Sequence, residues 1–377
     1  MRVQEEAGSS EGTERATTTD LLATANVRGV TARTLEYWRH EGLLPKAERT
    51  GQHGKRPEWT YPVGAIEQLG ALLRMRSKTK DPDLLRTGLW FDGYPIEVER
   101  LRNSITAVLH RSLDLMVKEI EKRREPGATG DDANWAALEQ IGRTLARKRG
   151  PNAPPRYGRQ ARVERERATT LALGLVVGDA GASARLEQDA PRVERMIGLD
   201  RGRRSRGGLP AWLDGPSDEG LQGFANIGSL PALIDTMKTA TDEELMASRG
   251  LARIMLDGVT AFARIADAFT GLDNASGFGA IAVFRDEPMA LVWLVSFVIA
   301  AGRSSELSEG LRAVVDSLSR QVLPVDSRAR ELAALGDDDL RDRLRELEAL
   351  PFAEQVRLKR LIADYRGQQG GLGQLGR

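Results

Sequence analysis

Apolar residues recur every three or four positions along most of this 377-residue chain, which is the spacing of an amphipathic helix. The longest stripe predicts a helix from about Pro95 to Arg124, preceded by a break at Gly88–Gly93 and ended by Pro126-Gly127. The later predicted helices have the same spacing and cover residues 131–148, 221–323, 337–350, where Asp337 is the expected N-cap, and 351–366. Strand signals are scarce, so the pattern predicts a mainly α-helical protein.

Two short helices joined by a glycine-containing turn are predicted near the N-terminus. The first runs from Asp20 to about Val27, and the turn is Arg28-Gly29-Val30. Thr31 is a good N-cap for the second helix, which runs to about Glu41 before Gly42 stops it. Residues 46–61 contain two glycines and a proline between candidate strands and predict a β-wing. Together these elements predict a winged helix-turn-helix, whose second helix suits the DNA major groove.

These boundaries predict six segments. A disordered tail is predicted at each end of the chain. Between the tails come the winged helix-turn-helix, the linking helices, a short helix with a basic linker, and a large α-helical C-terminal domain. In chain order the segments are 1–16 (tail), 17–80 (winged helix-turn-helix), 81–125 (linking or dimerisation helices), 126–167 (short helix and basic linker), 168–366 (C-terminal domain) and 367–377 (tail).

Composition and charge narrow the classes of function. Hydrophobic residues make up 41% and charged residues 29%, which supports a packed core. The chain has no cysteine, which excludes disulfides, thiolate metal sites and cysteine nucleophiles. Net charge is +1, but residues 28–80 hold eleven Lys or Arg against five Asp or Glu, a local charge of +6 that suits phosphate contacts. Residues 143–167 hold nine Lys or Arg and two Glu. This charge fits either a DNA-binding arm or a solvated linker.

No constellation in the sequence predicts an enzyme, a cofactor or a metal site. The G-x-G-x-x-G match at 371–376 lies in the terminal tail without a strand before it or a helix after it. His40, His53 and His110 have no second histidine at metal-ligand spacing. A set of large apolar residues favours core packing, with a pocket for a small apolar effector as the alternative: Met255, Phe262, Phe269, Phe284, Met289, Trp293 and Phe297.

Nothing in the sequence predicts a membrane or export segment. The longest uncharged apolar run, Pro288 to Gly302, has fifteen residues, and a bilayer span needs about 20. It predicts a buried helix. The first twenty residues are polar and acidic without an apolar core, unlike a signal peptide. We therefore expect a cytoplasmic, nucleoid-associated protein.

Residues 30–45, VTARTLEYWRHEGLLP, resemble the second helix and following turn of MerR-family transcription regulators. The resemblance covers about residues 18–125 and implies a winged helix-turn-helix, a long dimerisation helix and a variable effector domain. It implies a sequence-specific transcriptional regulator that binds palindromic operator DNA as a homodimer, with RNA polymerase as a further candidate partner. The dimer interface would then be the apolar stripe of the long helix: Leu101, Ile105, Leu109, Leu113, Met116 and Ile120.

The candidate DNA contacts follow from this resemblance and from position. Arg33 and Tyr37 match family positions that contact DNA, while the family would have Arg at Glu36, Tyr at Trp38 and Glu at Arg39. The wing of the family usually carries the motif Tyr-Arg-x-Tyr. This chain has Glu58-Trp59-Thr60-Tyr61 at that place, so the arginine of the motif is missing. Basic residues nearby in the predicted wing are the candidates to replace its charge. The full set of predicted contacts is Thr31, Arg33, Thr34, Tyr37, Arg39, Arg49, Lys55, Arg56 and Tyr61.

Two other classes of function stay open at this point. An architectural or recombination-associated DNA-binding protein is favoured if the basic segment 143–167 dominates binding. A protein–protein adaptor that keeps the winged helix as a scaffold is favoured by the missing wing arginine.

Overall fold

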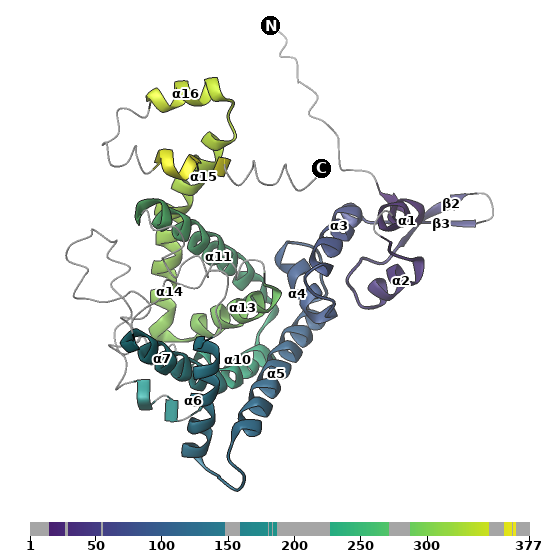
Figure 1. The fold of residues 1–377 in the computed structure, drawn as a ribbon. Coiled ribbons are helices and arrows are strands. Elements are labelled where there is room, and N and C mark those ends of the chain that lie inside the picture. The colour runs from purple at the N-terminus through teal and green to yellow at the C-terminus, as the bar shows by residue number, and fades with distance from the viewer. Residues whose placement is uncertain are drawn as a thin grey trace. The chain divides into compact units, whose positions relative to one another are not determined.

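A computed structural model describes residues 15–26, 29–53, 56–147, 159–179, 181–182, 184–186, 227–270, 287–346, 358–363 and 365–366. Most of these residues are helical, and a small three-stranded antiparallel sheet lies near the N-terminal end of the chain (Figure 1). The mainly α-helical class is therefore confirmed. The chain divides into two compact units, Met1–Val108 and Leu109–Arg377, and the division falls within the longest predicted helix.

The N-terminal unit begins with a strand that the sequence did not predict. The strands run in the order β1-β3-β2, with Ala16 paired to Tyr61 and an irregular register between Arg49 and Gly51. A strand of two residues is too short for an alternating pattern, so Ala16 was placed in the disordered tail. The elements of the unit are β1 (Ala16–Thr17), α1 (Thr18–Asn26), α2 (Ala32–His40), β2 (Glu48–His53), β3 (Arg56–Tyr61), α3 (Ala65–Arg76), α4 (Pro82–Phe91) and the first part of α5 (Val98–Arg123).

Both ends of α2 are fixed by local hydrogen bonds. Thr31 is the N-cap, as predicted, and its hydroxyl accepts from the backbone N–H of Thr34 at 3.3 Å. At the other end Gly42 has a φ of 69°, which favours glycine. The N–H of Leu43 donates to the carbonyl of Trp38 at 2.8 Å, the bond expected where a helix ends on such a glycine. The sequence alone therefore determines where this helix begins and ends.

Two boundaries after the sheet differ from the prediction. α4 runs through Gly88 to Phe91, and the break lies at residues 92–97. Gly88 packs against the side chain of Met75, whose sulfur would lie 2.8 Å from a Cβ at this position. α5 begins at Val98, so Pro95 precedes the helix instead of opening it.

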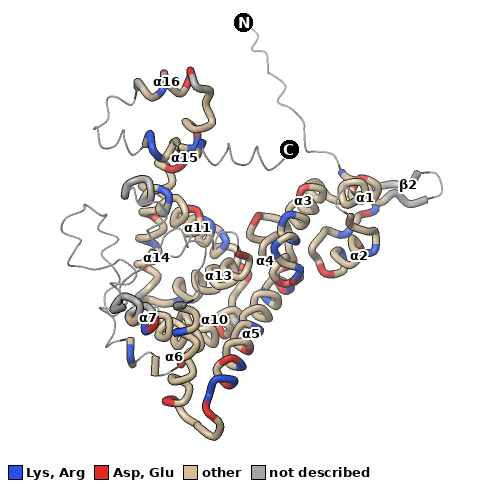
Figure 2. The backbone as a smooth tube through the Cα atoms, viewed as in Figure 1, with Lys and Arg blue, Asp and Glu red and all other residues tan. Residues whose placement is uncertain are grey.

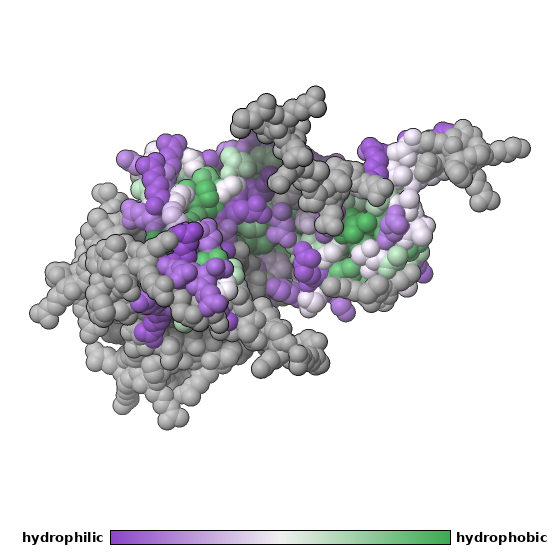
Figure 3. Space-filling model, turned by 90° about the horizontal axis from the view of Figure 1, so that it is seen from above, coloured by the Kyte–Doolittle hydropathy of each residue, from purple (hydrophilic) through white to green (hydrophobic). Residues whose placement is uncertain are grey.

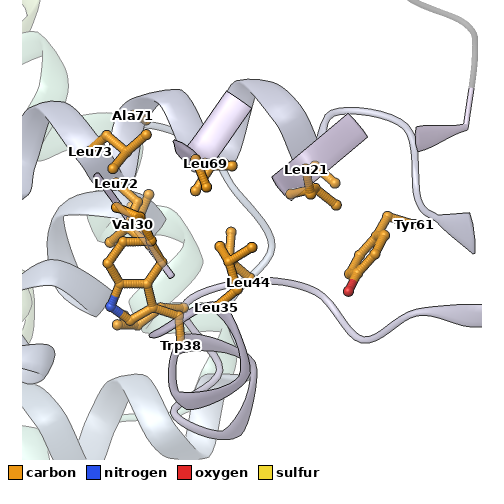
Figure 4. Packing of buried hydrophobic residues seen from close by; sticks show 14 of the residues in the cluster. Leu21, Val30, Leu35, Trp38, Leu44, Tyr61, Leu69, Ala71, Leu72 and Leu73 are labelled. Atoms are coloured by element: carbon orange, nitrogen blue, oxygen red, sulfur yellow. The ribbon is translucent and has the colours of Figure 1, made fainter. Parts of the chain in front are cut away.

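The core of the N-terminal unit joins its helices to the sheet. Leu43, Leu69, Leu72 and Leu89 are fully buried, and Trp38 is 3% exposed. Figure 4 shows Trp38 and Tyr61 within this cluster, together with leucines from α1, α2, α3 and the turn after α2. The core thus packs the inner face of α2 against the rest of the unit and leaves its outer face in solvent.

The regular elements of the C-terminal unit's described residues are all helical. α7 shows that the predicted linker is helical from Arg159 onward, and α13 confirms that the apolar run is a buried helix. Asp337 is the first residue of a helix instead of its cap. Besides the rest of α5 and residues 358–366, the elements are α6 (Asp131–Arg147), α7 (Arg159–Val177), α10 (Leu230–Thr239), α11 (Asp242–Thr270), α13 (Pro288–Arg303), α14 (Ser305–Ser317), a π-helical turn (Leu318–Val322), α15 (Leu323–Ala333) and α16 (Asp337–Glu346).

Several predicted segments lie outside the described residues. They are both predicted tails apart from Arg15 and Ala16, the part of the basic linker at 148–158, residues 187–226 of the predicted C-terminal domain and the start of the last helix at 351–357. Within the described part, no helix is both long and apolar enough to cross a membrane. On the face drawn in Figure 3, hydrophobic residues lie among hydrophilic ones.

A buried carboxylate holds three helices of the C-terminal unit together. Asp326 on α15 is fully buried, and its oxygens accept from Arg264 of α11 at 3.5 Å and from Arg330 one turn along α15. The Tyr365 hydroxyl, from the last helix, donates to the same carboxylate. Burial and the neighbouring carboxylate raise the pKa of Tyr365, so its hydroxyl stays protonated and can donate.

Candidate nucleic-acid interface

The outer face of α2 presents three polar side chains in one row. Arg33, Tyr37 and His40 are spaced by four and three residues, which places them on one side of the helix. All three are exposed, whereas Leu35 and Trp38 on the opposite side are buried. His40 was not among the predicted contacts, although its spacing from Arg33 and Tyr37 could have identified it. Figure 2 shows basic residues on α2 and on α3, which packs in the same unit.

Arg33 makes no hydrogen bond or ion pair with the residues that the structure describes. Its nearest acidic candidate along the helix, Glu36, pairs instead with Arg39, with an N–O distance of 3.4 Å. An ion pair with Glu36, one turn along the helix, would be the structural alternative to an external contact for this arginine. The structure leaves its five N–H donors open to an external acceptor.

Other predicted contacts serve the fold. Arg39 donates to the Tyr61 hydroxyl at 2.7 Å, and its guanidinium carbon lies 6.0 Å from the centre of that ring. Tyr61 is 3% exposed, so it lies in the core instead of on the surface where we expected it to meet DNA. The hydroxyls of Thr31 and Thr34 lie 3.1 Å apart at the start of α2 and shape its cap.

Three side chains from three different helices hold the C-terminal end of α2 and the turn after it. Arg100 of α5 donates to the carbonyl of His40 at 2.7 Å, and Arg86 of α4 donates twice to that of Glu41, at 2.7 and 3.1 Å. Gln68 of α3 donates to the carbonyl of Leu43 at 2.9 Å. Positive charge at a helix C-terminus is favourable because the last carbonyls there lack helical partners. These contacts fix the orientation of α2, and no local sequence signal indicates them.

Arg86 also bridges acidic groups in the interior. It is 6% exposed and lies 3.1 Å from the Glu41 carboxylate and 2.9 Å from that of Asp83, and it donates to the Ser104 hydroxyl of α5. A buried arginine is tolerable only when its charge and donors are matched in this way. The result is a rigid connection between the end of α2, α4 and α5.

The β2–β3 hairpin, which the sequence predicts as a wing, carries an arginine beside an exposed tryptophan. Arg49 on β2 is exposed and lies directly opposite Trp59 on β3, whose side chain is 50% exposed. Lys55 lies outside the described residues, and so does the side chain of Arg56 at the start of β3. Of the predicted wing contacts, Arg49 is therefore the one whose side chain the structure places at the surface.

The predicted dimer stripe is largely covered by the chain itself. Leu101, Ile105 and Leu109 are fully buried and Ile120 is 7% exposed, packed against Ala137 and its neighbours on α6. The other two predicted residues, Leu113 and Met116, are partly buried. The stripe is thus not a free face along its whole length, and the dimer interface stays a prediction for its middle part.

A pocket of about 260 Å³ lies between α5, α6 and α7. Its lining includes none of the residues predicted for an effector site. Met116 and Ile120 of α5, Leu138 and Ile141 of α6 and Leu173 of α7 supply its apolar walls. Of the residues predicted for an effector, Phe262 packs in a core cluster and Met289 is 38% exposed. The side chains of Phe269 and Phe284 lie outside the described residues.

Among the residues that the structure describes, no three His, Asp or Glu side chains come together as a metal site. Comparison with protein-family models, with curated proteins and with solved structures finds no match to this chain. The geometry of α2 and of the β2–β3 hairpin is therefore what bears on the function of this protein.

Proposed function

We propose that the chain is a sequence-specific DNA-binding transcriptional regulator in which α1, α2 and the β2–β3 wing act as a MerR-like winged helix-turn-helix. One observation carries the proposal: α2 is anchored from inside by three donors, and its outer face presents an arginine with no described partner. A recognition helix needs both properties, because its side chains must reach base edges from a fixed position. Arg33 lies in its first turn and can donate two hydrogen bonds to a guanine.

The charge of the segment supports the same partner. Residues 28–80 carry a net charge of +6, whereas the whole chain carries +1, so the remaining residues are net acidic. A basic patch on one module is the electrostatic footprint of a phosphate-binding surface. An adaptor that binds another protein has no need of this separation of charge.

The proposed regulator acts as a homodimer on a palindromic site, with α5 as the candidate contact. The middle of α5 keeps apolar surface in the described structure. Val117, one turn beyond the partly buried Leu113, is 40% exposed, and Leu115, on another side of the helix, is 68% exposed. A two-fold dimer would place two copies of α2 one helical turn of DNA apart.

The decisive experiment is selection of duplexes from a random-sequence library by the full chain, followed by footprinting of the strongest sites. Enrichment of one motif with two symmetric half-sites is expected. Binding without enrichment would overturn sequence-specific regulation in favour of an architectural role. No binding to any duplex would overturn DNA binding altogether and favour the adaptor.

Sedimentation of the Val117→Glu variant, which places a charge one turn from Leu113, tests the dimer. We expect a dimeric wild-type chain and a monomeric variant with an unchanged thermal midpoint, because this side chain is exposed. A variant that stays dimeric would remove α5 as the contact, and a monomeric wild-type chain would refute the homodimer.

A further inference from the structure

The last turns of α5 form one wall of the pocket between α5, α6 and α7. Met116 and Ile120, both from the stripe that was predicted to join two copies of the chain, line it from α5. Leu138 and Ile141 line it from α6, and Leu173 lines it from α7. Ile120 is 7% exposed and packs against α6, so a second copy cannot reach it. At this end of α5 the stripe therefore lines a pocket within one chain instead of a surface between two chains.

The pocket reaches from the surface to the core and is formed before anything binds. Of its lining residues, Leu145 is 41% exposed and Leu138 is 1% exposed. Beside them α6 and α7 approach closely, because a Cβ on Gly142 would lie 3.1 Å from the main-chain nitrogen of Thr170. This contact fixes the distance between α6 and α7, so two of the three walls are held in place.

The polar groups of the lining are matched to one another. The guanidinium of Arg123 lies 2.7 Å from the carboxylate of Glu119, one turn earlier on α5. It also donates to the Thr144 hydroxyl at 3.4 Å, and that hydroxyl donates to the carbonyl of Gln140 at 2.8 Å. The lining therefore has no net charge to attract an ion, and an ionised occupant would have to break the pair of Arg123 and Glu119.

The volume limits the size of an occupant. The pocket measures about 260 Å³, whereas an apolar protein cavity of about 150 Å³ binds benzene. We propose that the pocket binds a neutral, mainly apolar molecule of about the size of two fused aromatic rings. Such a molecule covers the apolar walls and removes them from water, which drives its binding. Neither DNA nor a second copy of the chain takes part in this contact.

Three naphthalene probes of similar size separate the effects of shape and charge. At pH 7, 2-naphthol is neutral, 2-naphthoate is an anion and 2-naphthylmethylamine is a cation. In equilibrium dialysis against the full chain, we expect 2-naphthol to bind at least about tenfold more tightly than either ion, because an ion loses water without gaining a free partner. Bound 2-naphthol should also raise the thermal midpoint, since it binds the folded chain.

Two variants locate the bound probe. Leu145→Glu places a charge at the exposed side of the pocket and should weaken 2-naphthol binding by about tenfold with an unchanged thermal midpoint. Ile141→Trp fills the pocket from α6 and should abolish binding. Val163→Glu is the matched control, because Val163 of α7 is 54% exposed and does not line the pocket, and it should bind 2-naphthol as the wild type does.

Three outcomes would overturn the inference. One is the absence of 2-naphthol binding up to its solubility limit. Tighter binding of either ion would contradict a neutral occupant, and wild-type 2-naphthol binding by both Leu145→Glu and Ile141→Trp would show that the probe binds elsewhere. None of these measurements contains DNA, so each of these results would leave the function proposed above in place.

Discussion

Among the residues that the structure describes, each unit buries one charged side chain, and the two charges are opposite. In the N-terminal unit Arg86 is surrounded by the carboxylates of Glu41 and Asp83, while in the C-terminal unit Asp326 is surrounded by Arg264 and Arg330. The hydrogen-bond partners of the two buried charges differ in kind. Arg86 also binds a main-chain carbonyl at the end of an exposed helix, whereas every partner given above for Asp326 is a side chain.

This difference separates two uses of a buried charge. Asp326 closes a core by tying α11, α15 and residues 358–366 together, so its loss should affect stability alone. Arg86 positions the surface on α2 that we propose to bind DNA, so its loss should affect stability and binding together. Substitutions of Asp326 and Arg86 test this distinction directly. Substitutions of Arg33 and Glu244 show what the loss of a more exposed charge does to binding and to stability.

The largest effect is expected from Asp326→Ala. It leaves two arginines facing each other without their shared carboxylate, which should cost about 3–5 kcal/mol of unfolding free energy. Hydrogen exchange should rise in α15 and residues 358–366, and DNA affinity of the folded protein should not change. Asp316→Ala is the control, because Asp316 pairs with Arg320 at the surface and its loss should cost less than about 1 kcal/mol. Equal effects of the two variants would contradict the role given to Asp326.

Arg86→Met should cost about 2–3 kcal/mol, less than the loss of Asp326. Methionine fills much of the volume of the arginine, whereas alanine leaves a cavity at the fully buried Asp326 and removes the acceptor of the Tyr365 hydroxyl. The Glu41 and Asp83 carboxylates that Arg86→Met leaves behind are 28% and 22% exposed and can regain water. Because the end of α2 loses an anchor, DNA affinity should fall as well. The surface pair of Arg15 and Glu48 provides the control through Arg15→Met, and unchanged binding by a folded Arg86→Met protein would remove the distinction between the units.

Arg33→Ala should lower specific DNA affinity by about 1–3 kcal/mol and leave the thermal midpoint nearly unchanged. The side chain has no described partner to lose, so the two measurements should separate cleanly. Tyr37→Phe removes one hydroxyl from the same face and should cost less. A folded Arg33→Ala protein that binds as tightly as the wild type would show that α2 does not enter the groove.

The smallest effect is expected at a partly exposed pair, Glu244 and Arg303. Hydrogen bonds from Arg303 lower the pKa of Glu244 from 4.5 to about 2. The stabilisation is therefore complete above pH 4.5 and is lost as the pH falls toward 2. Glu244→Gln should cost about 1 kcal/mol at pH 7 and almost nothing at pH 2, as measured by denaturant unfolding. A pH-independent difference would show that the charge contributes nothing.

Sequence reasoning succeeded where the determinant is local. The cap at Thr31, the stop at Gly42 and the buried helix at Pro288–Arg303 each follow from a few neighbouring residues. It failed where partners are distant. Arg86 is 45 residues from Glu41 and Arg100 is 60 from His40, so nothing in their own neighbourhoods marks them as anchors of α2.

The exposed residues of α2 were easier to predict from the sequence than the buried residues around the helix. Arg33 and Tyr37 came from a short motif, and the structure places both on an exposed face. The same motif gave no reason to place Tyr61 in the core or to notice Trp59, because burial depends on how far α2 covers the sheet. Exposure is a tertiary property, and the spacing of residues along one strand does not determine it.

The anchors of α2 have one consequence for how this protein can change. Arg100, Arg86 and Gln68 bind the main-chain carbonyls of His40, Glu41 and Leu43, which are present whatever side chains those positions carry. The outer face of the helix is built from side chains alone. Residues 33, 37 and 40 can therefore be exchanged as a set while the helix keeps its orientation, so new binding preferences can arise on α2 without rebuilding the unit that holds it.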